Sequence, residues 1–147
     1  MSTVLLKTQE LGSFLNISNA EVELMRVLWH EHPLTVGQVV ERVRRTQQWH
    51  ENTIKTMLNR LVKKGVVVRH KDGGRFFYRA DVQEHDFLTN ESESLLKRLF
   101  GGKTAPLIAH LASQEKLSEE DIAEIEAVLR SMKLAAEGKD DDRGSDG

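Results

Sequence analysis

A change of hydrophobic period at Gly65 constrains the fold of this chain more than any other feature. Before this glycine, residues 51–64 carry apolar side chains at helical spacing, namely Ile54, Met57, Leu58, Leu61 and Val62. After it, residues 66–71 and 75–80 are β-rich runs, and the Asp72-Gly73-Gly74 segment between them is typical of a hairpin turn. The sequence therefore predicts a helix that leads directly into a β-hairpin.

Two further helices are expected before this one. Ser18-Asn19-Ala20-Glu21 and Thr35-Val36-Gly37-Gln38 are both capping-box patterns, and apolar residues follow each of them at helical spacing. Pro33 ends the first helix, and we expect a short strand near Leu34. Three helices followed by a hairpin are the order of a winged helix-turn-helix, which we assign to residues 18–82.

The rest of the chain is predicted to be helical. In residues 83–136, Gly101-Gly102 separates one amphipathic helix from a short one, and Ser118 opens a third. Three such helices form a poor core alone, so we expect this segment to be a dimerisation domain that pairs with a second copy. Its expected interface residues are Leu95, Leu96, Leu99, Phe100, Leu107, Ile108, Leu111, Ile122, Ile125, Leu129 and Met132. Residues 1–17 are predicted to be a flexible arm, and residues 137–147 a disordered acidic tail.

The net charge of −2 conceals two halves of opposite sign. Residues 18–80 hold 12 Lys and Arg against 6 Asp and Glu, whereas residues 81–147 hold 8 against 16. This division favours a polyanion-binding part beside a part that does not meet polyanions, although surface charge can also divide in this way by chance.

Several classes of function are not supported by the sequence. The chain has no cysteine, which excludes disulfides and thiolate metal sites, and His30 and His32 lack further ligands at a recognisable spacing. No nucleophile elbow, paired catalytic carboxylates or dinucleotide fingerprint occurs, so we predict neither an enzyme nor a cofactor. No apolar run approaches the ~20 residues of a membrane helix, and Val4-Leu5-Leu6 is too short for a signal peptide. We therefore expect a cytoplasmic protein without membrane insertion.

The face opposite the apolar stripe of residues 51–64 carries side chains that suit DNA. These residues are Asn52, Thr53, Lys55, Thr56, Asn59, Arg60 and Lys63. Asn can pair with adenine, Arg or Lys with guanine, and a Thr methyl can touch thymine. An ordinary solvated helix face would mix both charge signs, yet Glu51 is the only acid between Glu41 and Asp72. We interpret this face as a DNA-reading surface.

Two neighbouring segments add basic residues. Arg69, Lys71 and Arg75 lie near the tip of the predicted hairpin, where they can contact the DNA backbone. The aromatic residues that follow, Phe76, Phe77 and Tyr78, are interpreted as core rather than as base-stacking groups. Arg42, Arg44 and Arg45 end the second helix, and either phosphate contacts or the helix dipole would explain them. Trp29 and Trp49 are expected to pack, and His110 to be a packed or interfacial residue.

Longer runs resemble a known family. The segment Asn52-Thr-Ile-Lys-Thr-Met-Leu-Asn-Arg-Leu-Val-Lys-Lys-Gly65 is similar to the recognition helix of the BlaI/MecI/CopY family of penicillinase and methicillin-resistance repressors. Residues 18–29 resemble the first helix of that family, and residues 91–102 and 114–122 resemble its dimerisation helices. The resemblance implies a homodimeric repressor that binds inverted-repeat operators in double-stranded DNA, classically with TACA/TGTA half-sites.

The departures from the family pattern concern induction. In β-lactam-responsive members, a membrane sensor-protease system leads to cleavage at an Asn-Phe bond, and His110-Leu111 occupies the matching position here. The copper-responsive members sense metal through C-terminal cysteines, which this chain lacks. His50-Glu51 replaces the usual Ser-Pro before the recognition helix, which alters the expected N-cap. The resemblance thus extends to the fold and the repressor role but not to the inducer.

Two other functions remain open at this stage. The basic face could bind an acidic protein partner, which would make the chain a protein-interaction module. The chain could also sense a small ligand directly between its domains, in the manner of MarR-type regulators.

Overall fold

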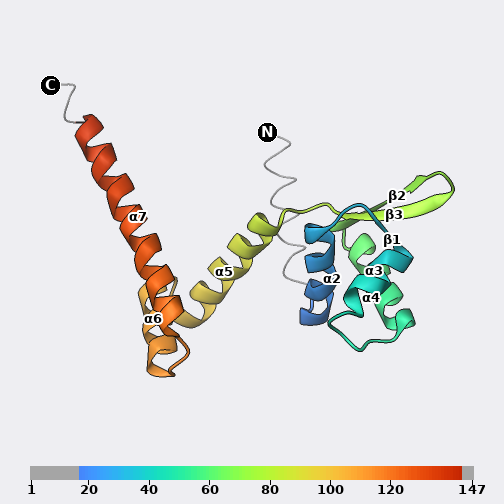
Figure 1. Cartoon of the computed structure of the whole chain (residues 1–147), viewed down its shortest axis with the longest axis horizontal. Coiled ribbons are helices and arrows are strands. Elements are labelled where there is room, and N and C mark those ends of the chain that lie inside the picture. Colours follow the sequence, from blue (N-terminus) through green and yellow to red (C-terminus); the bar gives the residue numbers. More distant parts are fainter. Residues whose placement is uncertain (1–16, 144–147) are drawn as a thin grey trace. The chain divides into compact units, whose positions relative to one another are not determined.

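A computed structural model describes residues 17–143 and the side chains of residues 17–139 (Figure 1). Contacts within the chain divide it after Leu95 into two compact units, which are described separately. The arm predicted for residues 1–17 lies outside the described residues except for Ile17. That residue is half-buried and packs against the core of the first unit.

The first unit contains three helices and a three-stranded sheet. Its elements are α2 (Asn19–His30), β1 (Leu34–Thr35), α3 (Val36–Val43), α4 (Glu51–Lys63), β2 (Val67–Asp72) and β3 (Arg75–Ala80). The sheet is antiparallel with the order β1-β3-β2, and the β2–β3 hairpin extends beyond α3 and α4 (Figure 1). This arrangement is a winged helix-turn-helix, as the sequence predicts, and the hairpin is its wing.

Local sequence signals explain where these elements begin and turn. Thr35 Oγ1 accepts a hydrogen bond from the backbone N–H of Gln38, and the Gln38 side chain accepts one from the N–H of Thr35. This reciprocal pair confirms the capping box at the start of α3. At the wing tip, Gly73 and Gly74 have φ values of 57° and 82°, which a two-residue turn of this type requires.

The core of the first unit extends into α5 (Glu84–Phe100). The indole N–H of Trp29 donates to the carbonyl oxygen of Val82 at 2.8 Å, and its ring lies 5.3 Å from that of Phe87. Val82 and Phe87 are both buried. The division after Leu95 therefore falls later than the boundary at Val82 that the sequence suggests, because the first turn of α5 packs with the winged helix.

One buried charge joins two helices of the core. Glu21 in α2 is 4 % exposed, and both of its carboxylate oxygens accept hydrogen bonds from Lys64 Nζ, at 2.9 and 2.8 Å. Ser18 Oγ caps the N–H of Glu21 as predicted and also donates to its carboxylate. Glu21 thus forms an ion pair between α2 and the end of α4. Its carboxylate accepts from the Ser18 hydroxyl, so the Ser18 cap is present without the reciprocal bond of the predicted capping box.

The second unit contains the end of α5, α6 (Thr104–Ser113) and α7 (Glu119–Arg143). Gly101 and Gly102 follow α5 with φ values of 59° and 80° and separate it from α6. The N–H of Ser118 donates to the Asp121 carboxylate, which lowers the pKa of Asp121 and completes a reciprocal cap with the Ser118 hydroxyl.

Helix α7 extends into the segment for which the sequence predicts a disordered tail. Helix α7 continues beyond Ala136 as far as Arg143, and residues 144–147 lie outside the described part of the chain. Glu137 and Lys139 are good helix formers, so the single Gly138 between them does not stop the helix. Among the described helices, none is both long and apolar enough to cross a bilayer.

Replacement of Lys64 by Met is expected to destabilise the first unit by about 2 kcal/mol, because it leaves the buried Glu21 carboxylate without its cation. Urea unfolding of the full chain measures this change. Lys63→Met is the matched control, since Lys63 is exposed on the same turn, and its effect should stay within about 0.5 kcal/mol. Equal losses for the two variants would contradict a stabilising role for the Glu21–Lys64 pair.

Candidate nucleic-acid interface

Helix α4 has one buried face and one polar exposed face. Ile54, Met57, Leu58 and Leu61 are buried in the core. Of the residues predicted to read DNA, Lys55 is half-exposed and the others are exposed, namely Asn52, Thr53, Thr56, Asn59, Arg60 and Lys63. The structure therefore brings the predicted residues of this helix together on one accessible surface, the α4 face.

Hydrogen bonds within the helix occupy only part of the α4 face. Thr56 Oγ1 donates to the carbonyl oxygen of Asn52 at 2.8 Å, and Lys55 Nζ lies 3.2 Å from a Glu51 carboxylate oxygen. Within the described residues, the side chains of Asn59, Arg60 and Lys63 form no hydrogen bond or ion pair. Their donors and acceptors are therefore available to an external partner.

The α4 face begins at an unusual cap. His50 is the N-cap of α4, and its Nδ1 accepts a hydrogen bond from the backbone N–H of Asn52 at 3.1 Å. A ring nitrogen thus replaces the serine oxygen expected at this place in the family pattern. Sequence reasoning identifies the departure at His50 but not the cap, because the orientation of an imidazole is not encoded in a local pattern.

The wing adds an exposed cationic cluster that includes an aromatic ring. Arg69, Lys71 and Arg75 are exposed, as predicted. Phe76, however, is 45 % exposed, with the Arg69 guanidinium carbon 4.5 Å and Lys71 Nζ 5.8 Å from its ring centroid. The prediction that this ring is core is wrong, because the tip of the wing extends past the helices that would cover it. These cation–π contacts hold the two cations beside one another despite their like charge.

The other two wing aromatics lie closer to the core. Tyr78 pairs with Leu34 of β1 and is buried, which confirms its predicted role. Phe77 is half-buried and stacks on His70, with ring centroids 5.8 Å apart. Exposure of this aromatic run therefore increases toward the turn.

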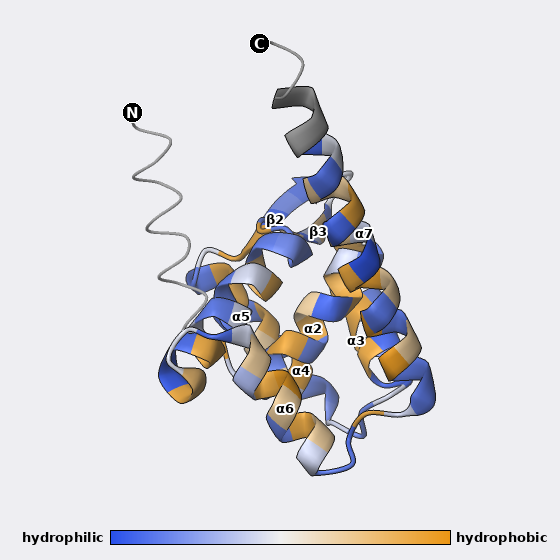
Figure 2. Ribbon diagram, turned by 90° about the vertical axis from the view of Figure 1, so that its left-hand side faces the viewer, coloured by the Kyte–Doolittle hydropathy of each residue, from blue (hydrophilic) through white to orange (hydrophobic). Residues whose placement is uncertain are grey.

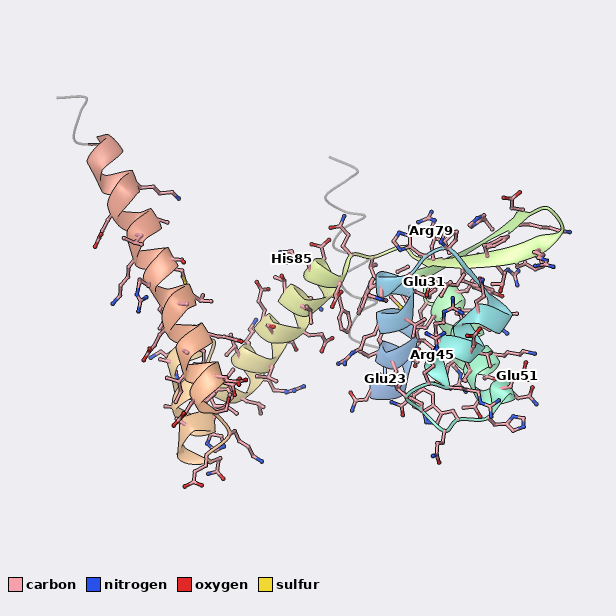
Figure 3. The ribbon with its side chains drawn as sticks, in the orientation of Figure 1. Glu23, Glu31, Arg45, Glu51, Arg79 and His85 are labelled. Atoms are coloured by element: carbon pink, nitrogen blue, oxygen red, sulfur yellow. The ribbon has the colours of Figure 1, made fainter. Side chains whose placement is uncertain are left out.

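The three arginines near the end of α3 differ in their surroundings; Arg45 is labelled in Figure 3. Arg42 donates two hydrogen bonds of 3.0 Å to the Glu31 carboxylate, which lowers the pKa of Glu31 and raises that of Arg42. Arg45 pairs with Glu41 at 3.0 Å, whereas Arg44 is exposed. Arg42 is thus engaged within the protein, an explanation that differs from both the phosphate and the dipole interpretations.

Outside the α4 face and the wing, the described residues include a cavity but no metal-binding cluster. In the part of the chain that the structure describes, no group of three or more His, Cys, Asp or Glu residues could hold a metal ion. A cavity of about 340 Å³ lies within the first unit, between the end of α2 and the start of α5, and its lining includes Trp29, Val82 and Glu84. It does not include the α4 face.

The apolar residues predicted for dimerisation are largely uncovered. Ile122, Leu129 and Met132 of α7 are 44, 51 and 64 % exposed, and orange and blue residues alternate along this helix in Figure 2. Leu95, Leu99 and Ile108 are also exposed, whereas Leu96, Phe100, Leu107, Leu111 and Ile125 are half-buried. The sequence analysis missed three further exposed apolar residues, Leu88, Val128 and Leu134.

The two residues that the resemblance matches to a cleavage position, His110 and Leu111, lie inside α6. His110 is exposed, with its ring 6.4 Å from that of Phe100, and Leu111 is half-buried. Within this chain His110 thus contacts Phe100 but stays exposed, and an interfacial role stays a prediction.

A winged helix-turn-helix with an exposed polar and basic helix face is the type of protein that this geometry defines. Comparisons with known proteins specify it further, because the family described as "Penicillinase repressor" matches residues 17–131. The chain belongs to this family of DNA-binding transcriptional repressors, which confirms the resemblance and the prediction that the chain is not an enzyme.

Two relatives cover most of the chain, and a solved structure covers about half of it. It is 34 % identical to the penicillinase repressor of Bacillus licheniformis over 80 % of this chain and 91 % of the relative. It is 30 % identical to the methicillin resistance regulatory protein MecI of Staphylococcus aureus, over 77 % of this chain and 92 % of that protein. A solved structure of the DNA-binding domain of the repressor BlaI shares 39 % identity, with a TM-score of 0.45, over 48 % of this chain and 87 % of that one.

Replacement of His50 by Ala is expected to cost about 1 kcal/mol, because the N–H of Asn52 loses its side-chain acceptor. Urea unfolding measures the loss, and hydrogen exchange should show faster exchange at the first turn of α4. His50→Ser is the control, since serine supplies an oxygen at the same position and should preserve the stability. If the Ala and Ser variants were equally stable, the ring nitrogen would not be an effective cap.

Proposed function

We propose that this protein represses transcription as a homodimer that binds an inverted-repeat operator, with one α4 face in the major groove of each half-site. The observation that carries the proposal is the group of exposed, unengaged side chains of Asn59, Arg60 and Lys63 on α4. Asn and Arg can each form bidentate contacts with a base edge, and Lys suits a phosphate or guanine. Membership of a repressor family supports the same reading.

The wing is proposed to contact DNA beside the major-groove site. Arg69, Lys71 and Arg75 present cations at its exposed tip, where backbone contacts would fix the orientation of α4. Phosphate contacts carry little sequence information, so we assign specificity to α4 and positioning to the wing.

The exposed apolar residues of α5, α6 and α7 support the homodimer. Ile122, Leu129 and Met132 would remain in water in a single chain, and a second copy would bury them. Two linked half-site contacts also bind an inverted repeat more tightly than one, because the second contact is intramolecular. A signal from a membrane sensor-protease system stays a prediction from the family resemblance.

A fluorescence anisotropy titration on the promoter upstream of the protein's own gene tests the proposal. We expect saturable binding to an inverted repeat well above scrambled DNA, with affinity that falls steeply as salt rises. Equal, salt-sensitive binding to both DNAs would contradict sequence recognition at that promoter. Absence of binding at low salt would instead favour the protein-interaction module.

Asn59→Ala and Arg60→Ala are expected to weaken operator binding about 10-fold to 100-fold, while the sedimentation coefficient of the free protein stays that of a dimer. Each variant removes a side chain that can pair with a base edge. Affinity for scrambled DNA should change less than affinity for the operator. A uniform loss on every sequence would identify these residues as phosphate contacts instead.

Arg42→Ala provides a charge-matched comparison with Arg60→Ala. Both changes remove one positive charge from the first unit, but Arg42 is already bound to Glu31. We expect the operator affinity of Arg42→Ala to remain within about 3-fold of the unmodified protein under the same salt conditions. A loss as large as that of Arg60→Ala would show that total charge, rather than the α4 face, determines affinity.

A further inference from the structure

The longest helix of the second unit carries a pattern typical of a paired helix. Along α7, apolar residues recur at alternating spacings of three and four, at Ile122, Ile125, Leu129, Met132 and Ala136. This is the repeat of a coiled-coil seam, in which the first, third and fifth of these residues are a positions and the other two are d positions. Every residue of this seam except the half-buried Ile125 is exposed, so most of the seam is uncovered within the described chain.

Charge is distributed unequally along the same helix. Residues 119–126 contain five acidic residues and no basic residue, whereas Arg130 and Lys133 follow in the next two turns. Acidic residues in the first turn complement the helix dipole, but that effect fades within a turn and does not explain Glu126. Among the described side chains, neither Glu126 nor Lys133 forms an ion pair or hydrogen bond.

The register places these two charges at equivalent positions. Glu126 follows the d residue Ile125, and Lys133 follows the d residue Met132, so both are e positions beside the seam. In an antiparallel pair of helices, e positions face e positions of the partner helix. In a parallel pair, an e position faces the preceding g position, which would set Glu126 against a second acid, Asp121.

We infer that α7 pairs antiparallel with α7 of a second copy, with Glu126 of each copy facing Lys133 of the other. The inference rests on the proposed homodimer and adds the orientation and register of its helices. The two symmetric charge pairs favour this orientation, and the like charges of the parallel alternative oppose it. The two helices cross near Leu129, so the Leu129 residues of the two copies lie side by side. The Ile122 residues of the two copies lie about 15 residues apart along the helix axis, which corresponds to about 22 Å.

Charge exchange tests the orientation. Glu126→Lys and Lys133→Glu each set like charges against one another twice per dimer, and we expect each to raise the dimer dissociation constant on the order of tenfold at low salt. The double variant Glu126→Lys/Lys133→Glu has the original net charge and sets opposite charges against one another again. Its dimer dissociation constant should return to that of the unmodified protein. Glu124→Lys is the matched control, because Glu124 lies away from the seam and should have a smaller effect.

Sedimentation equilibrium of the full chain gives these constants, and circular dichroism checks that each variant keeps its helix content. Tighter association of Glu126→Lys alone would indicate a parallel pair and overturn the inference. If the double variant kept a raised dimer dissociation constant, Glu126 and Lys133 would not face one another, and this result would also overturn the inference.

Cross-linking provides a second measurement that does not depend on charge. The chain has no cysteine, so Leu129→Cys and Ile122→Cys each introduce a single thiol. With a short bismaleimide linker, we expect covalent dimers of Leu129→Cys and none of Ile122→Cys. Covalent dimers of both variants would indicate parallel helices, and dimers of neither would show that α7 contacts a different element of the partner.

The unmodified protein separates failure of this inference from failure of the proposed function. A chain that sediments as a dimer and binds its operator, but lacks the expected cross-link, loses only the α7 pairing. A chain that remains monomeric at concentrations that saturate the operator contradicts the homodimer itself.

Discussion

Burial of one face of α4 is the constraint on which the rest of the first unit depends. Ile54, Leu58 and Leu61 are fully buried, so the rotation of α4 about its own axis is fixed by the core. A rotation of even a quarter turn would expose leucine and bury asparagine and arginine, at a cost that a small domain cannot offset. The polar face is therefore a rigid surface whose direction is determined by packing on the opposite side.

The same packing links the wing and α5 to α4. The end of α4 is held to α2 through Lys64 and Glu21, and the chain then enters β2 directly after Gly65. The strand that returns, β3, leads to Val82, whose carbonyl oxygen is bound by Trp29 of α2. The wing is therefore anchored at both ends. The Glu21–Lys64 pair holds the end of α4 before β2, and the Trp29–Val82 hydrogen bond holds the segment between β3 and α5.

Much of the fold could be predicted from the sequence because its signals are local. The stripe on α4, the capping box at Thr35 and the Gly73-Gly74 turn each depend on residues within a few positions, and the structure contains all three. The missed features depend on distant residues. The Glu21–Lys64 ion pair joins residues 43 positions apart in the chain. The exposure of Phe76 depends on how far the wing extends beyond the helices, which no local pattern specifies.

The site was predictable to a similar extent. The residues of the α4 face follow from helical spacing alone, whereas the engagement of Arg42 by Glu31 requires the meeting of two helices. The cap at His50 depends on one side-chain rotamer. The composition of residues 137–143 also did not predict the length of α7. A polar, charged segment can be helical when its residues favour that conformation.

The two glycines at the wing tip have a consequence for how such a protein can acquire a new specificity. A Cβ built on Gly73 or Gly74 meets no atom within 4 Å, so there is space for a side chain at both positions. The positive φ angles nevertheless disfavour most other residues there, and the barrier is conformational rather than steric. Substitutions at the turn itself are therefore a disfavoured way to evolve binding to a different operator. Variation on α4, to which we assign the specificity, leaves the backbone undisturbed and offers the easier route.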